Sequence, residues 1–117
     1  MINAEERSCT TQFELGQMFR KEDEARDFQQ AANWFQRSAQ QGYRKAQYHI
    51  GVMYARGVGV SRDYARAYAW LKVAACQGSR RARRYLERIA PKIPREQQLQ
   101  AHRLARSYYN TYVVPFA

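Results

Sequence analysis

The sequence is poor in acidic residues and cysteine, and it has no long apolar run. Only 10 residues are Asp or Glu against 20 Lys or Arg, giving a formal net charge of +10. We expect its two cysteines, Cys9 and Cys76, to be reduced thiols, because two are too few for a disulfide framework. No stretch approaches the roughly 18 apolar residues of a membrane span, and the N-terminus is polar where a signal peptide is apolar. If Met1 is the native start, these absences predict a cytoplasmic protein that does not bind a membrane.

The sequence also lacks the residue groupings of metal sites, cofactor loops and catalytic centres. Its two histidines, His49 and His102, have no Cys or carboxylate at ligand spacing. Residues 57–60 (Gly-Val-Gly-Val) lack the third glycine of a dinucleotide loop and the Gly-Lys-Ser/Thr of a phosphate loop. No general base or orienting partner accompanies Cys76. We therefore predict no metal, no cofactor and no enzymatic activity.

Length and composition predict a single folded domain with an uneven charge. Hydrophobic residues make up 45% of the 117 residues and aromatic residues 14%, too many for a disordered basic tail. Residues 1–43 carry five bases and seven acids, a net charge of −2, whereas residues 44–117 carry 15 bases and three acids, a net charge of +12. The second part of the chain thus holds all the excess positive charge.

An internal repeat organises the chain. Gly16 recurs as Gly51 after 35 residues, and Trp34 recurs as Trp70 after 36. The 36-residue offset also relates Asp27, Phe28, Ala31, Ala39, Gly42 and Ala46 to Asp63, Tyr64, Ala67, Ala75, Gly78 and Ala82. Because a period of this length is typical of stacked helical repeats, each copy should be one helix pair.

Apolar spacing predicts two helices in each copy. In the first copy the helices should cover residues 11–20 and 28–40, and in the second the leading helix should cover 44–56. Asp27 and Asp63 are predicted N-caps of the second helices, and Gly42 and Gly78 lie where those helices should end. The conserved spacing of Trp34 and Trp70 places both in the predicted core.

A third copy begins at Ala82 and then diverges. Glu87 replaces the glycine of the first two copies, Pro91 ends the helix early, and a last helix follows Pro94. We read this part as a C-terminal cap. The predicted organisation is one domain with an N-terminal segment (1–10), repeat 1 (11–45), repeat 2 (46–81), a divergent repeat and cap (82–110) and an apolar tail (111–117).

The second copy resembles a complete Sel-like repeat (SLR), a relative of the tetratricopeptide repeat. The matching residues are Ala46, Ile50, Gly51, Tyr54, Gly57, Gly59, Val60, Asp63, Arg66, Ala67, Trp70, Ala74, Ala75 and Gly78. This resemblance implies an all-α fold, a right-handed α/α solenoid of two Sel-like repeats plus a divergent C-terminal capping helix pair. It also implies a protein-protein interaction module or adaptor rather than a catalyst.

A predicted concave surface follows from the first helix of each copy. Opposite the core face of helix 44–56, at about 100° per residue, lie Lys45, Tyr48 and Val52. The repeat offsets give the equivalents Thr10, Phe13 and Gln17 in the first copy and Arg81, Arg84 and Arg88 in the third. Arg44, Arg80 and Arg83 add charge nearby. Charge runs are often only a solvated face, but we expect this stripe to bind an acidic, partly aromatic segment of a partner protein.

Two other functions fit the same charge. The arginine cluster is compatible with nucleic-acid binding, and an immunity or inhibitor protein that masks an acidic toxin or enzyme surface is a role that some members of the family have. The apolar tail (112–117) could fold back on the solenoid or mediate self-association, which the charge asymmetry would also favour.

Overall fold

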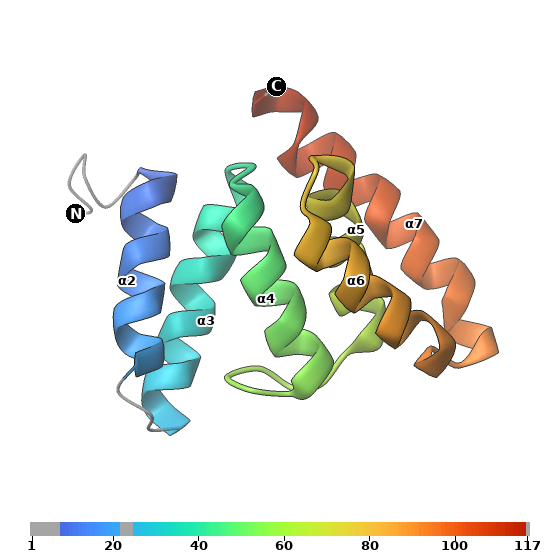
Figure 1. Cartoon of the computed structure of the whole chain (residues 1–117), viewed down its shortest axis with the longest axis horizontal. Helices are drawn as coiled ribbons and strands as arrows, with labels where there is room; N and C mark the ends of the chain where they lie inside the picture. Colours follow the sequence, from blue (N-terminus) through green and yellow to red (C-terminus); the bar gives the residue numbers. More distant parts are fainter. Residues whose placement is uncertain (1–7, 22–24, 117) are drawn as a thin grey trace.

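The chain forms a row of α-helices. The computed structural model describes residues 8–21 and 25–116, and this part contains no β-strand. The α-helices, which follow one another across the molecule in Figure 1, are α2 (Cys9–Lys21), α3 (Ala25–Gln40), α4 (Arg44–Arg56), α5 (Tyr64–Cys76), α6 (Arg80–Ile89) and α7 (Arg95–Tyr112). Short 3₁₀ turns, η1 (Ala90–Lys92) and η2 (Val114–Phe116), follow α6 and α7. The all-α prediction is confirmed, and α4 has the bounds that the apolar spacing predicts.

Both copies of the repeat end their second helix in the same way. Gly42 and Gly78 have φ of 84° and 97°, a conformation that glycine adopts without a Cβ penalty. The following amides then close the helix ends, with Tyr43 N donating to Ser38 O at 3.3 Å and Ser79 N donating to Ala74 O at 3.1 Å. These turns reverse the chain and start α4 and α6 at equivalent positions.

The two predicted aspartate caps have different outcomes. Asp63 is the N-cap of α5, and its carboxylate accepts a hydrogen bond from Arg66 N at 3.1 Å. Asp27 is not a cap, because α3 begins at Ala25 and Asp27 lies inside its first turn. A carboxylate in the first turn still interacts favourably with the helix dipole, which suits an aspartate at the third residue of α3.

The recurring glycine allows the helices of each pair to approach closely. A Cβ on Gly16 would lie 2.8 Å from Phe35 Cδ1, and one on Gly51 would lie 2.8 Å from Leu71 Cγ. Phe35 and Leu71 are fully buried, so neither can move aside without disturbing the core. Tight pairing of α2 with α3 and of α4 with α5 therefore depends on these two glycines.

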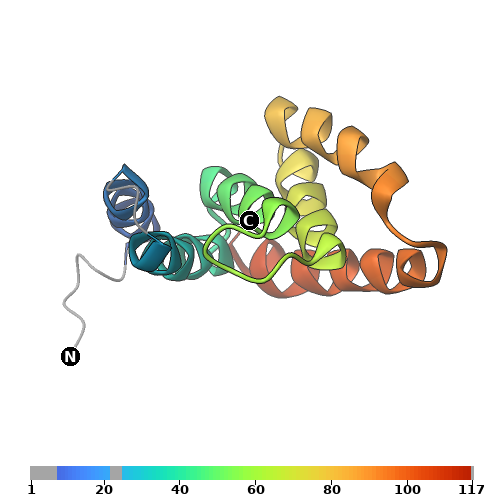
Figure 2. The same cartoon turned by 90° about the horizontal axis from the view of Figure 1, so that it is seen from below.

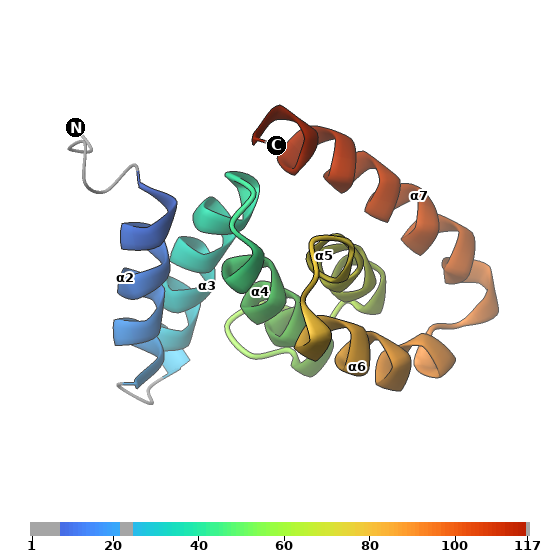
Figure 3. The ribbon, with the colours of Figure 1, turned by 45° about the horizontal axis from the view of Figure 1, so that its top comes forward.

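The third copy lacks this pairing. Glu87 stands at the glycine position, and α6 packs on α5 and α4 but scarcely touches α7. Instead α7 packs along α5, on the side of the molecule where α3 lies (Figure 2). In Figure 3 the helices α6 and α7 diverge from their connection at residues 90–94, with α5 between them. The C-terminal cap is thus an open helix pair.

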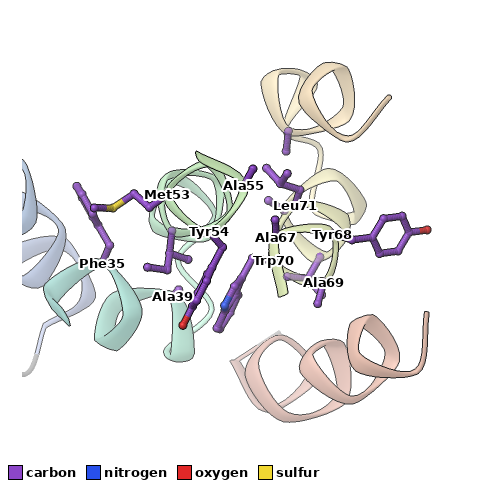
Figure 4. Close-up of a cluster of buried hydrophobic side chains, with 14 of the residues drawn as sticks. Phe35, Ala39, Met53, Tyr54, Ala55, Ala67, Tyr68, Ala69, Trp70 and Leu71 are labelled. Atoms are coloured by element: carbon purple, nitrogen blue, oxygen red, sulfur yellow. The ribbon is translucent and has the colours of Figure 1, made fainter. Parts of the chain in front are cut away.

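Aromatic stacking holds α7 in place. The ring centroid of Trp70 lies 4.5 Å from that of Tyr108 and 5.3 Å from that of Tyr112. Trp70 is fully buried within the central cluster of Figure 4, as predicted, but Trp34 is only partly buried. The prediction of a core position for Trp34 is wrong in this respect, because α7 covers α5 and not the equivalent face of α3. Arg37 covers part of the Trp34 ring, at 4.9 Å from its centroid.

The C-terminal tail lies against its own chain. Val113 is buried, and a Cβ on Gly42 would lie 3.0 Å from Tyr112 O and 3.3 Å from Phe116 Cβ. The tail therefore packs beside the turn between α3 and α4, while the side chains of Val114 and Phe116 stay largely exposed.

Candidate partner-binding groove

A cavity of about 570 Å³ opens between the first helices of the three copies. Its lining residues come from α2, α4, the turn before α6 and the start of α6. They are Phe13, Gln17, Arg44, Lys45, Tyr48, His49, Gly78, Ser79, Arg80 and Arg81. We call this cavity the front groove. Five residues of the sequence-derived stripe meet in it: Phe13, Gln17, Lys45, Tyr48 and Arg81.

The other stripe residues lie elsewhere. Val52 lines an adjoining cavity of about 310 Å³ beside Arg20 and Arg56, and Thr10 is exposed at the start of α2. Arg84 and Arg88 are exposed farther along α6 and do not line the front groove. The stripe therefore marks a surface longer than the groove itself.

Four cations of the groove occupy equivalent places in two copies. Arg44 and Lys45 are the first residues of α4, and Arg80 and Arg81 are the first residues of α6. The free N–H groups of a helix start carry partial positive charge, which adds to the charge of the side chains. In the described part of the chain, none of these four side chains forms an ion pair. The mouth of the groove thus carries positive charge that no described acid neutralises.

Polar contacts join α4 to the C-terminal end of α5 beside the groove. Arg44 Nη1 donates to Gln77 O at 2.9 Å, and Gln77 Nε2 donates to the side chain of buried Gln47 at 2.5 Å. Gln12 and Gln41 form the equivalent pair in the first copy, where Gln41 Nε2 donates to Gln12 Oε1 at 2.7 Å. The sequence analysis missed these pairs, although the repeat offsets of 35 and 36 residues relate them.

Aromatic rings form the floor of the groove. Phe13 is buried, with its ring centroid 5.3 Å from those of Tyr43 and His49. The His49 ring also stacks on Phe35, at 5.1 Å and an interplanar angle of 12°. Above this floor, Arg81 Cζ lies 4.6 Å from the ring centroid of Tyr48, within the range of a cation–π contact. Tyr48 is half-buried and lies beside a guanidinium group.

His49 belongs to the floor as a neutral ring. Burial, together with the smaller effects of the charges of Arg20 and Arg81, lowers its pKa from 6.5 to about 4. Arg20 Nη1 lies 3.4 Å from Nδ1 of His49, which suits an unprotonated nitrogen that accepts. Sequence reasoning missed His49, whose only signal was its position next to Tyr48 on the same helix.

The groove can hold an anionic chain by charge and hydrogen bonding. It offers a row of cationic donors above an apolar floor.

The described residues show neither a metal site nor a membrane span. No three of their His, Cys, Asp or Glu side chains come together as metal ligands would. No helix among them is long and apolar enough to cross a membrane.

Family and structural comparisons agree with this architecture. The Sel1 repeat model matches residues 11–43 and 44–79, more than half of the chain. The chain belongs to the Sel1 repeat family. Sel1 repeats are in general protein-protein interaction modules, and their solenoid is typically a non-catalytic scaffold. The predicted resemblance and the solenoid fold are both confirmed.

Two solved structures show the same Sel1-repeat fold. A protective antigen of uropathogenic Escherichia coli, c5321, which displays an SLR fold, is 30% identical with a TM-score of 0.86. A Sel1 repeat protein from Oxalobacter formigenes is 24% identical with a TM-score of 0.66, a likeness of fold alone. The alignments cover 94% and 87% of this chain but only 24% and 44% of those proteins. The chain thus spans a fraction of their length. No curated protein matches the chain.

Proposed function

We propose that this Sel1 repeat domain is an interaction module whose front groove binds an acidic segment of a partner protein. The observation that carries the proposal is the convergence of Arg44, Lys45, Arg80 and Arg81 at the starts of α4 and α6. Basic residues oppose the helix dipole at these places, so the fold gives up stability by keeping them there. An acidic ligand offsets that cost.

The aromatic residues favour a peptide over nucleic acid. Nucleic-acid binding through stacking needs open ring faces, as in single-strand binding proteins. In the front groove, Phe13 is buried against Tyr43 and His49, and one face of Tyr48 is covered by Arg81. These covered rings leave less open ring face for stacking a base than a nucleic-acid site needs, and they therefore favour a peptide. An inhibitor that masks an acidic enzyme surface would use the same cations, but it would need tight binding to a single partner.

A titration with defined peptides tests the proposal. The probe is a fluorescein-labelled peptide of six glutamates and one tyrosine, and its control has glutamine in place of glutamate. We expect the glutamate peptide to bind at least 10-fold more tightly than the glutamine peptide at low salt, because only the former is attracted to the groove.

Matched variants separate the groove from the overall charge. Lys45→Glu with Arg81→Glu should lower the affinity for the glutamate peptide at least 10-fold. Arg95→Glu with Arg103→Glu changes the net charge equally on exposed residues of α7 and should leave the affinity within about 2-fold. If both variants lost affinity equally, the binding would depend on the net charge of the protein and not on the front groove. Tighter binding of a single-stranded oligonucleotide, with a steep salt dependence, would favour the nucleic-acid alternative.

A further inference from the structure

A second groove lies between α5 and α7, away from the front groove. It is a cavity of about 290 Å³, and one face of each helix lines it. From α5 come Tyr68, Lys72, Val73 and Cys76, and from α7 come His102, Ala105, Arg106, Tyr109 and Asn110. We call this cavity the side groove. Both sets have the spacing of a single helix face, so the groove runs along about two turns, or about 12 Å.

The open geometry of the third copy creates this groove. In the second copy, α4 packs on both α3 and α5. At the corresponding place in the third copy, α6 packs on α5 but scarcely touches α7. Figure 4 shows Tyr68 directed into the space between the ribbons of α6 and α7. In the second copy α4 fills the space between α3 and α5, whereas the corresponding space between α5 and α7 in the third copy is left open.

The groove has an apolar floor and a basic rim. Val73 and Ala105 are buried, and Tyr68 is held at one end by a 3.2 Å hydrogen bond between its hydroxyl and His102 Nδ1. Lys72 and Arg106, both exposed, face the groove from opposite helices. No described acidic residue lines it. A ligand that complements this surface carries apolar side chains on one face and negative charge beside them.

We propose that the side groove is a second docking site, which takes an acidic amphipathic helix of a partner protein. The occupant is a helix because its apolar residues, three or four positions apart, match a floor that is two turns long. Its flanks are acidic because Lys72 and Arg106 border the floor without described acidic neighbours. This site does not depend on the front groove, and it gives the domain two separate surfaces for partners.

Cys76 allows a direct test, since its thiol is exposed and lines the groove. A Cys9→Ser background leaves Cys76 as the single cysteine. The probes are 14-residue helical peptides with two leucines four positions apart, flanked by four glutamates or by four lysines. Each has a terminal cysteine as a mixed disulfide with cysteamine. Exchange with Cys76 releases cysteamine, and intact-mass spectrometry in 2-mercaptoethanol buffer measures the captured fraction at equilibrium.

We expect at least 5-fold greater capture of the glutamate-flanked peptide than of the lysine-flanked peptide, each relative to cysteamine alone. Replacing both leucines of the peptide by serine should abolish the excess. Lys72→Glu with Arg106→Glu should reverse the charge preference, whereas Arg95→Glu with Arg103→Glu should preserve it. The front-groove variant Lys45→Glu with Arg81→Glu should also preserve it, so the two proposals can fail separately.

Three outcomes would overturn the proposal. Equal capture of the two peptides would show that the groove has no preference for an acidic ligand. Equal capture of the peptide without leucines would show that the apolar floor does not contribute to binding. A Cys76-linked dimer that forms in preference to every peptide would place a second copy of the chain in the groove.

Discussion

The guanidinium carbon of Arg81 lies 4.6 Å from the ring centroid of Tyr48, joining the start of α6 to the middle of α4 across the front groove. Neither residue is fully buried, so the contact adds modestly to stability. Its main effect is to hold a cation at a fixed place above the aromatic floor.

A double-mutant cycle measures this contact. Tyr48→Leu and Arg81→Met should show an interaction of about 0.5–1 kcal/mol in the free energy of unfolding, since a partly exposed cation–π pair has that strength. Urea denaturation of the four proteins provides the values. Tyr48→Leu combined with Arg88→Met, two turns farther along α6, should be additive within about 0.5 kcal/mol. Additivity in both cycles would mean that Arg81 and Tyr48 do not interact.

The two repeat tryptophans should differ in their contribution to stability. Trp70 is fully buried and stacked by Tyr108 and Tyr112, so Trp70→Ala should cost about 3–5 kcal/mol. Trp34→Ala, at the equivalent but partly exposed position, should cost about 1–2 kcal/mol. Thermal melts followed by circular dichroism compare the two variants. Equal losses would contradict the different coverage of the two rings.

The helix-pairing glycine should not tolerate even one methyl group. Gly51→Ala places a Cβ 2.8 Å from Leu71 Cγ, and such overpacking should destabilise the protein by about 1–3 kcal/mol. Glu87→Ala is the matched control, because it changes the equivalent position on α6, where the side chain is exposed. That change should stay within about 0.5 kcal/mol. Urea denaturation midpoints of the two variants measure these changes in stability. If Gly51→Ala were as stable as the wild type, the two helices could move apart without a loss of stability.

His49 should make stability depend on pH in the acidic range. Its pKa is about 4 in the folded protein, against an ordinary value of 6.5, so the unfolded chain binds the proton more readily. The resulting stability is fully present above about pH 6.5 and is lost as the pH falls towards 4. His49→Phe keeps a ring but does not titrate, and its free energy of unfolding should fall less than that of the wild type over this range.

Urea denaturation at pH 7, 5.5 and 4.5 tests the difference. His102→Phe, which removes the other histidine of the chain, is measured beside His49→Phe for comparison. If His49→Phe and the wild type lost stability in parallel, a group other than His49 would carry the pH dependence.

The sequence predicted the repeat and most helix ends because these depend on local chemistry. Asp63 caps α5, and Gly42 and Gly78 end their helices in a left-handed backbone conformation that glycine adopts without a Cβ penalty. The apolar period likewise fixed the bounds of α4, since a helix must turn one face towards its partners. Asp27 was misassigned because a first-turn position and a cap attract the same residue type.

The candidate front groove was predictable only in part. The offsets placed Phe13, Lys45, Tyr48 and Arg81 on one stripe, but they could not show where the surface is hollow. The pKa of His49 is lowered by burial and by two arginines on other helices, and these surroundings exist only in the assembled fold.

By itself, the sequence determined a Sel1 helical solenoid and a basic second part. Only the tertiary structure decided how the third copy is arranged. Glu87 stands at the position where Gly16 and Gly51 permit close contact in the first two copies, and α7 packs on α5 through Trp70 instead of pairing with α6. Whether a helix pair closes depends on contacts between residues far apart in the chain, so periodicity along the chain does not reveal it.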